Sequence, residues 1–246
     1  MCIRDRLCYE MNINGHSFEL DSTTIVDFNK LQFHPYLRAE KEKGNWHFTA
    51  AVNKSWFPAD DLFSSLPKGL FSNLEGIKTS GELAYHFLLD IDFAQLDSLK
   101  LESELKEKDF RITSYGATSL SKMSDEFIYT AYENGIPVRT FPIGPSCEHF
   151  TPLDSISPIL RMSVMQSEDG AFFYHRGFLP DALREALIYD LQVKRFARGG
   201  STITMQLVKN VFLNRNKNFA RKLEEALIVC CLLYTSPSPR DRQKSR

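Results

Sequence analysis

The chain has 246 residues, of which 43% are hydrophobic and 25% charged, and its formal net charge at pH 7 is −1. This length and composition allow a buried core, as one large or two smaller domains, and exclude an intrinsically disordered protein. The balanced charge gives no overall sign of nucleic-acid binding, and we expect no nucleic-acid partner.

Both ends of the chain differ in character from the rest. Residues 1–8 and 230–246 resemble translated sequencing-adapter sequence, and the second stretch ends a helical pattern in polar, low-complexity sequence. We expect both stretches to be artefacts, so that the region between them is a truncated fragment. Four of the five cysteines lie in these ends, and their spacing fits neither a metal site nor a disulfide framework. No apolar run reaches the roughly 18 residues that span a bilayer.

Residues 9–114 predict a β-rich domain. Aromatic and β-branched residues concentrate at 46–52, 82–89 and 110–113, with glycine-containing turns between them. Leucines alternate with charged residues over 96–108, which favours a strand over a short helix. Residues 115–158 contain five prolines and predict an extended linker.

From residue 159 to 229 the apolar periodicity is helical. Pro180 begins one helix, whose apolar stripe runs over 182–191. Ser201 or Thr202 caps the next helix. We expect the buried faces of the last two helices to contain Ile203, Leu207 and Val211, and then Leu223, Ala226 and Leu227. The sequence therefore predicts an α+β protein, with a β-rich N-terminal region followed by an all-helical domain.

Positive charge gathers in this helical region. Residues 176–225 contain ten Lys or Arg and five Asp or Glu. Such an excess suits an anionic substrate or an anionic membrane surface, and it also suits a solvated helical face. The charge count alone leaves these alternatives open.

Three motifs follow one another in this region. They are Glu-Asp-Gly-Ala-Phe-Phe-Tyr-His-Arg-Gly at 168–177, Gly-Gly-Ser-Thr-Ile-Thr-Met-Gln-Leu-Val-Lys-Asn at 199–210, and Arg-Lys-Leu-Glu-Glu at 221–225. Together they closely resemble the family 51 glycosyltransferases, the peptidoglycan transglycosylases of penicillin-binding-protein type. The resemblance covers about 70 residues of the N-terminal half of that domain. Met205 stands where the family has a glutamine, and the family's last two motifs are absent.

The resemblance implies a lysozyme-like helical fold and a reaction that polymerises lipid II into glycan strands with inversion. Inverting transfer needs a base for the acceptor hydroxyl and positive charge for the departing pyrophosphate. Glu168 corresponds to the family's base, and we expect partial burial to raise the pKa of its carboxyl. Its alternative role is a helix-end carboxylate paired with Arg176 or Lys209.

Glu225 corresponds to the family's second essential carboxylate, near the pyrophosphate and a divalent metal, Mg or Mn. Its alternative role is an exposed partner of Arg221 on the same helix. No organic cofactor is expected. The remaining site predictions are the phosphate-binding and substrate-binding residues Lys209, Arg221, Lys217, Gln206, Asn210, Ser201 and Thr202, with Asp169, His175 and Lys222 in support.

The aromatic residues Phe172, Phe173, Tyr174 and Phe178 favour a buried core, with partial lipid contact as the alternative. The resemblance places the protein at the periplasmic face of the bacterial inner membrane, with its anchor outside this fragment. Expected partners are lipid II, the nascent glycan chain, the membrane surface, and transpeptidase, divisome or elongasome proteins.

Two other functions remain open. One is a lytic peptidoglycan glycosidase, which needs no cationic set for a diphosphate. The other is a non-catalytic envelope protein that handles lipid or acts as a scaffold, since residues 9–114 faintly resemble AsmA-like regions. We expect the 246-residue chain by itself to be inactive, because the resemblance covers only part of the domain.

Overall fold

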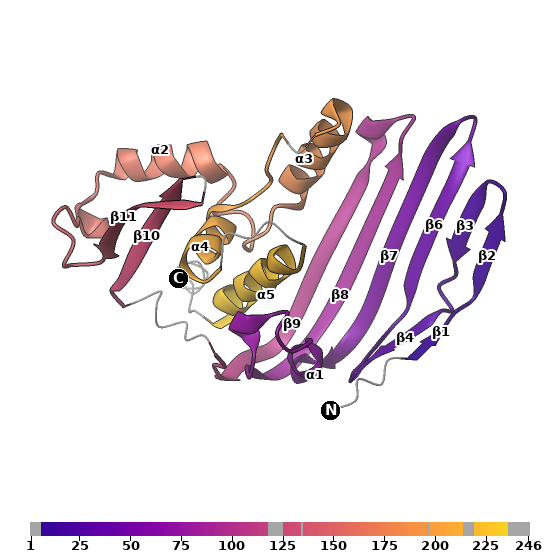
Figure 1. Cartoon of the computed structure of the whole chain (residues 1–246), viewed down its shortest axis with the longest axis horizontal. Coiled ribbons are helices and arrows are strands. Elements are labelled where there is room, and N and C mark those ends of the chain that lie inside the picture. Colours follow the sequence, from indigo (N-terminus) through magenta and orange to yellow (C-terminus); the bar gives the residue numbers. More distant parts are fainter. Residues whose placement is uncertain (1–5, 118–124, 134, 196, 214–218, 236–246) are drawn as a thin grey trace, which may run out of the picture. The chain divides into compact units, whose positions relative to one another are not determined.

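The computed structural model describes residues 6–117, 125–133, 135–195, 197–213 and 219–235. The chain divides into two compact units, which are interleaved along the sequence (Figure 1). The first consists of Met1–Pro67, Ile77–Ser114 and Leu179–Ser201, and the second of Lys68–Gly76, Tyr115–Phe178 and Thr202–Arg246. The fold is α+β with a β-rich N-terminal region, as the sequence predicts.

A six-stranded antiparallel sheet dominates the first unit, in the order β2-β3-β6-β7-β8-β9. Its strands are β2 (Met11–Asn14), β3 (Ser17–Leu20), β6 (Pro35–Glu42), β7 (Asn45–Pro58), β8 (Lys78–Asp92) and β9 (Lys100–Ser114). A smaller sheet joins β1 (Arg6–Cys8), β4 (Ile25–Phe28) and β5 (Leu31–Phe33) in the order β1-β4-β5. The expected strand at 96–108 is largely confirmed, because β9 follows a short 3-10 helix at Leu96–Ser98.

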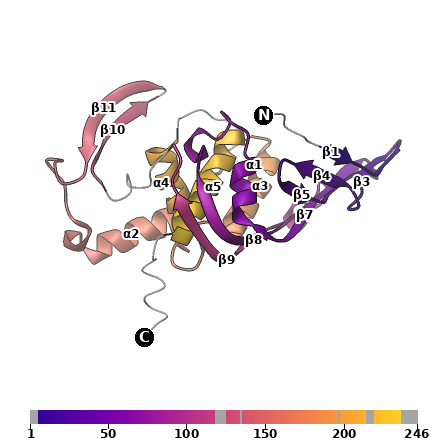
Figure 2. The same cartoon turned by 90° about the horizontal axis from the view of Figure 1, so that it is seen from below.

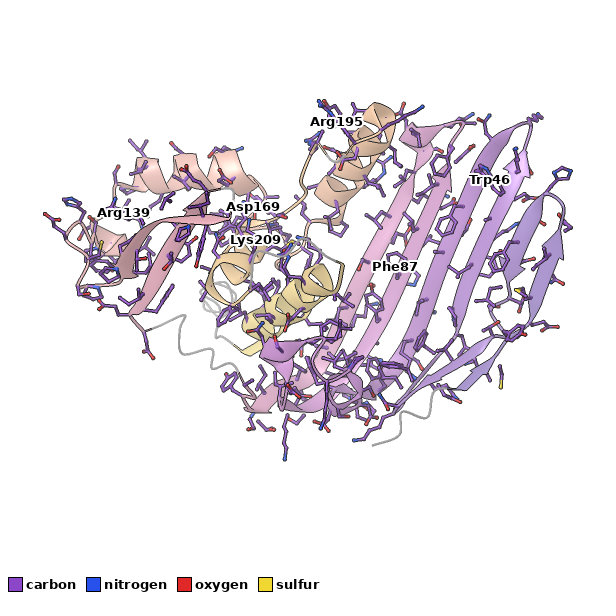
Figure 3. The ribbon with its side chains drawn as sticks, viewed as in Figure 1. Trp46, Phe87, Arg139, Asp169, Arg195 and Lys209 are labelled. Carbon is purple, nitrogen blue, oxygen red and sulfur yellow. The ribbon has the colours of Figure 1, made fainter. Side chains whose placement is uncertain are left out.

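One face of the large sheet is apolar. Residues that pair directly across two strands point to the same face of a sheet. The pairing along all six strands therefore shows which side chains belong to this face. Ile13 and Trp46 on this face are 67% and 49% exposed, and Figure 3 labels Trp46 and Phe87 of the same face. The apolar members include Met11, Ile13, Phe18, Leu20, Leu37, Ala39, Trp46, Phe48, Ala50, Val52, Phe87, Leu89, Ile91 and Leu101.

The opposite face of the sheet is polar. The Asp90 carboxylate accepts a hydrogen bond from Thr49 Oγ1 at 3.0 Å, and His47 Nε2 lies 2.5 Å from the same oxygen. Burial raises the pKa of Asp90, but the hydrogen bonds from His47 and Thr49, together with the positive charges of His47 and Lys100, hold that pKa below its usual value. The alternation of apolar and polar residues along each strand therefore separates the two faces.

Two helices complete this unit. Helix α1 (Ala59–Ser65) packs on β8, and its Phe63 ring lies 6.1 Å from that of Phe110. Helix α3 (Pro180–Val193) begins at Pro180, as predicted, and packs against β9 (Figure 1; Figure 2 gives the view from below). The Arg184 guanidinium ties it down by donating to the Leu99 and Asp97 carbonyls at 2.5 and 2.6 Å.

The described part of the second unit contains a hairpin and three α-helices. Strands β10 (Phe127–Glu133) and β11 (Ile136–Ile143) pair antiparallel, so the stretch expected to be an extended linker contains a β-hairpin. Pro137 and Pro142 fit within β11 because each strand of a two-stranded ribbon has an edge that needs no donor. The helices are α2 (Pro158–Asp169), α4 (Ile203–Val211) and α5 (Phe219–Thr235), preceded by 3-10 turns at Ser72–Leu74 and Leu153–Ser155.

The helical boundaries differ from the prediction in two respects. Residues 179–201 group with the β-rich unit, not with the other helices. Helix α5 continues past residue 229 into the expected artefact, where Cys231 is buried. None of the described helices is long and apolar enough to cross a membrane.

Gly81 is required where β8 bulges against β9. Its φ is +89°, and a Cβ atom there would lie 2.4 Å from the Asp109 carbonyl oxygen. We expect Gly81→Ala to lower the free energy of unfolding by at least about 2 kcal/mol, from left-handed strain plus overlap with the backbone. Urea denaturation followed by circular dichroism measures it.

Gly44→Ala is the matched control. Gly44 has nearly the same φ, +90°, but a Cβ atom there would have no described atom within 4 Å. It should cost about 1 kcal/mol from strain alone. Equal losses for the two variants would show that the overlap at Gly81 is unimportant.

Candidate active site

The end of helix α2 places two neighbouring carboxylates in opposite environments. Asp169 is buried and Glu168 is exposed. Consecutive residues of a helix point about 100° apart, so turning Asp169 inward turns Glu168 outward. The expected burial of Glu168 is therefore wrong: the buried member of the pair is Asp169.

Asp169 joins three segments of the second unit. His175 Nε2 lies 2.8 and 3.0 Å from the two Asp169 oxygens, and the backbone N–H of Ile203 donates to Oδ2 at 3.1 Å. The side chains of Asp169 and His175 are only 2% and 4% exposed. An ionised carboxylate only accepts hydrogen bonds, so Nε2 carries the proton. Asp169, labelled in Figure 3, and His175 thus fix the end of α2 against the start of α4.

Thr202 connects the first motif with the second. Its hydroxyl accepts from the Met205 backbone N–H at 3.2 Å, which caps α4, and donates to the Gly177 carbonyl at 2.6 Å. The predicted cap is confirmed at Thr202. Ser201, the residue before the cap, is the last residue of a segment that groups with the β-rich unit, and its role in substrate binding stays a prediction.

Gly177 connects the first motif with α5. Its φ is +74°, and a Cβ atom there would lie 2.2 Å from Leu233 and 2.7 Å from Val229. Only glycine combines this backbone conformation with so close an approach. The first motif, the third motif and residues 202–210 of the second motif therefore lie within one unit.

The buried face of α4 differs from the prediction. Met205, Val208 and Phe212 are buried, whereas Leu207 is 41% exposed; Ile203 and Val211 are half-buried. The bonds of Thr202 and Asp169 to the first turn fix the rotation of the helix and turn Met205 inward. An apolar methionine suits this buried position, which accounts for the departure from the family's glutamine.

Gln206 brings the second motif to Glu168. Its side-chain amide donates to Glu168 Oε2 at 3.1 Å. Lys209 and Asn210 are exposed on the same helix, and Figure 3 labels Lys209 on α4. Lys217 lies outside the described residues. The structure thus holds the exposed Glu168 carboxylate beside an amide on a helix that carries a lysine.

Glu225 on α5 is held by two cations. Arg221 Nη1 lies 3.1 Å from Oε2, and Lys222 Nζ lies 2.5 Å from Oε1. The Glu225 side chain is only 1% exposed, so the expected pair with Arg221 is present but the carboxylate is buried, not exposed. Taking a charge out of water is costly, and two cations on one carboxylate offset that cost.

The buried face of α5 also differs from the prediction. Leu223 is 44% exposed and Glu224 is 5% exposed, while Ala226 and Leu227 are half-buried. Glu224 accepts hydrogen bonds from the backbone N–H and the side-chain amide of Asn73, at 2.7 and 3.2 Å. The sequence contains no sign of the contact between Asn73 and Glu224, because no local pattern connects positions 151 residues apart.

The cysteines of α5 are not candidate nucleophiles. Burial raises the pKa of the Cys230 thiol to about 12 and also raises the pKa of the Cys231 thiol. Both side chains are therefore neutral thiols at physiological pH, and the thiolate is the reactive form.

The predicted metal at Glu225 is not supported by its neighbours. Each Glu225 oxygen is paired with a cation, and the described residues contain no group of three or more His, Cys, Asp or Glu suited to a metal ion. The donor set that Mg²⁺ prefers is made of oxygens. A metal at this position stays a prediction from the resemblance.

Comparison with known proteins finds the same family as the motifs. A family profile described as Transglycosylase matches residues 134–234, hereafter called the transglycosylase segment. The resemblance drawn from the three motifs is thereby confirmed.

Individual relatives agree with this assignment. Biosynthetic peptidoglycan transglycosylases of Chromobacterium violaceum and Nitrosospira multiformis are 45% and 43% identical, over 34% and 33% of this chain. The chain spans only 36% and 35% of their lengths. Penicillin-binding protein 1B of Haemophilus influenzae is 27% identical over 68% of this chain and 25% of its own length, so that match extends beyond the transglycosylase segment. No solved structure matches the chain.

Asp169 offers a direct test of how the transglycosylase segment is held together. Asp169→Ala would leave a buried imidazole and the Ile203 N–H without their acceptor. We expect it to lower the free energy of unfolding by about 3 kcal/mol, measured by urea denaturation. Glu185→Ala removes an exposed glutamate paired with Arg198 at 3.4 Å and should cost less than about 1 kcal/mol. Similar losses for both would contradict a joining role for Asp169.

Proposed function

We propose that the transglycosylase segment catalyses inverting transfer from lipid II to a growing glycan strand, on a lysozyme-like helical domain. The observation that carries the proposal is the hydrogen bond from Gln206 of the second motif to the exposed Glu168 of the first motif, in the unit that also contains the third motif. The names of the relatives at 45% and 43% identity support peptidoglycan as the substrate class.

Glu168 is the proposed general base. Its carboxylate takes the proton of the acceptor hydroxyl as the oxygen attacks the anomeric carbon of the lipid-linked sugar. The bond from that carbon to the lipid diphosphate breaks on the opposite face, and the electron pair leaves with the diphosphate. The amide of Gln206 fixes one Glu168 oxygen at 3.1 Å and so orients the base before substrate binds.

Arg221 and Lys209 are the proposed cations for the diphosphate. Arginine grips phosphate oxygens with two parallel hydrogen bonds, whereas lysine acts as a point charge. Arg221 lies against Glu225, which fixes the guanidinium. This cationic set favours transfer over lytic hydrolysis, since hydrolysis has no diphosphate to stabilise.

Exposed apolar side chains support action at a membrane surface. Helix α2 and the turn after it present large apolar residues to solvent, and Tyr174 is 90% exposed. We therefore propose a lipid-contacting surface and a location at the periplasmic face of the inner membrane. The residues of this surface are Ile159, Leu160, Met162, Val164, Phe173 and Tyr174.

Glu168→Gln tests the proposed base, because it removes the charge and keeps the shape. We expect glycan polymerisation to fall about 10²- to 10⁴-fold, the contribution typical of a general base. Binding of a short-chain, water-soluble lipid II analogue should stay within about threefold of the original, because the variant keeps a group that can hydrogen-bond.

Polymer is measured by gel electrophoresis, in a protein that contains the transglycosylase domain at the full length of its relatives. Glu185→Gln is the control, since Glu185 is exposed on α3 and pairs only loosely with Arg198, at 3.4 Å. Polymer formation by Glu168→Gln at the original rate would refute the role of Glu168.

A further inference from the structure

Two adjacent residues of α5 are both buried carboxylates. Glu224 is 5% exposed and Glu225 is 1% exposed. Neighbouring acids repel each other, and each loses its hydration on burial. Such a pair is stable only where both members are compensated separately.

The compensation of Glu225 comes from its own helix, and that of Glu224 from a distant loop. Arg221 and Lys222 hold Glu225. Asn73 donates to Glu224 from its backbone N–H and from its side-chain amide. Asn73 belongs to Lys68–Gly76, a loop between α1 and β8 that groups with the helical unit.

The Lys68–Gly76 loop has a second attachment in the same unit. The Ala117 backbone N–H donates to the Glu75 carbonyl at 2.8 Å. The 3-10 helix at Ser72–Leu74 contains Asn73 and contacts α5. The position of Asn73 against Glu224 is therefore supported by the contact of its 3-10 helix with α5 and by the bond at Glu75, two residues further along the chain.

Without Asn73, the two glutamates would compete for the same cation. Arg221 precedes Glu224 by three residues and Glu225 by four, and both spacings allow an ion pair on a helix. Hydrogen bonds from Asn73 satisfy Glu224 without a charge. Arg221 and Lys222 then remain with Glu225.

We propose that the Lys68–Gly76 loop is a positioning element of the transglycosylase site, in which Asn73 holds Glu224 and so keeps Arg221 available to Glu225 and the diphosphate. This inference rests on the proposed function, because it assigns Arg221 to the diphosphate. The loop lies outside the matched residues 134–234, so it adds a contribution from the β-rich region of the sequence.

Asn73→Asp tests the proposal with little change of shape. It replaces the amide donor with a carboxylate that repels Glu224, which then turns to Arg221. Affinity of the full chain for the short-chain lipid II analogue, measured by calorimetry, should fall about tenfold, the effect typical of a lost hydrogen bond to a charged group. Amide exchange at residues 68–76 should become faster.

The second variant separates charge competition from loss of structure. Asn73→Asp combined with Glu224→Ala keeps the loop detached but removes the competing carboxylate. The proposal expects affinity to return to within about twofold of the original while exchange at 68–76 stays fast, since the two sites are directly coupled. Asn53→Asp, at an exposed position of β7, is the matched control and should change neither quantity.

The outcomes separate the proposals. Unchanged affinity in Asn73→Asp, or a loss that the second substitution does not restore, would overturn the positioning role. If Arg221→Ala leaves the affinity of the original chain unchanged, the assignment of Arg221 to the diphosphate fails, and the positioning role fails with it. Amide exchange would still report in that case whether Asn73 attaches the loop to α5.

Discussion

The arrangement of the site depends on the burial of one carboxylate. Asp169 is nearly inaccessible to solvent, and its charge is compensated by His175 and the Ile203 N–H. Because these donors come from different segments, the carboxylate fixes the end of α2, the turn after it and the start of α4 together. Turning Asp169 inward is also what presents Glu168 to solvent, where a base can meet its substrate. A structural requirement and a chemical one are thus met by adjacent residues.

Helix α5 also contains two adjacent acidic residues, and the two are stabilised in different ways. Glu225 is stabilised by two cations from the preceding turn, whereas Glu224 is stabilised by neutral donors from a loop. Neutral donors satisfy a buried carboxylate without adding a charge that would alter its neighbour. The electrostatic environment of Glu225 therefore depends on hydrogen bonds that Glu225 does not make.

Local signals predicted much of this structure, and long-range contacts decided the rest. The Pro180 helix start, the Thr202 cap and the strand at 96–108 follow from residue preferences over a few positions. The buried faces of α4 and α5 were predicted wrongly. Apolar periodicity carries no information about hydrogen bonds from other segments, and such bonds set the rotation of each helix so that Met205 and Glu224 face inward. The hairpin at residues 127–143 was missed because its prolines resemble those of a linker. The motifs singled out Glu168, Gln206 and Glu225 as candidates, whereas the bond from Asn73 to Glu224 is visible only in the folded chain.

The interleaving of the two units has a consequence for synthesis. Residues 68–76 leave the ribosome well before their partner on α5, which follows 151 residues after Asn73. At usual elongation rates the delay is on the order of ten seconds. During that interval Phe71 and Leu74, both buried in the folded protein, lack the residues of α5 that pack near them. Helix α3 likewise is synthesised after the strands of the sheet that it joins. The nascent chain therefore cannot complete one unit and then the other, and a cut at residue 114 would remove from each unit a segment that it needs.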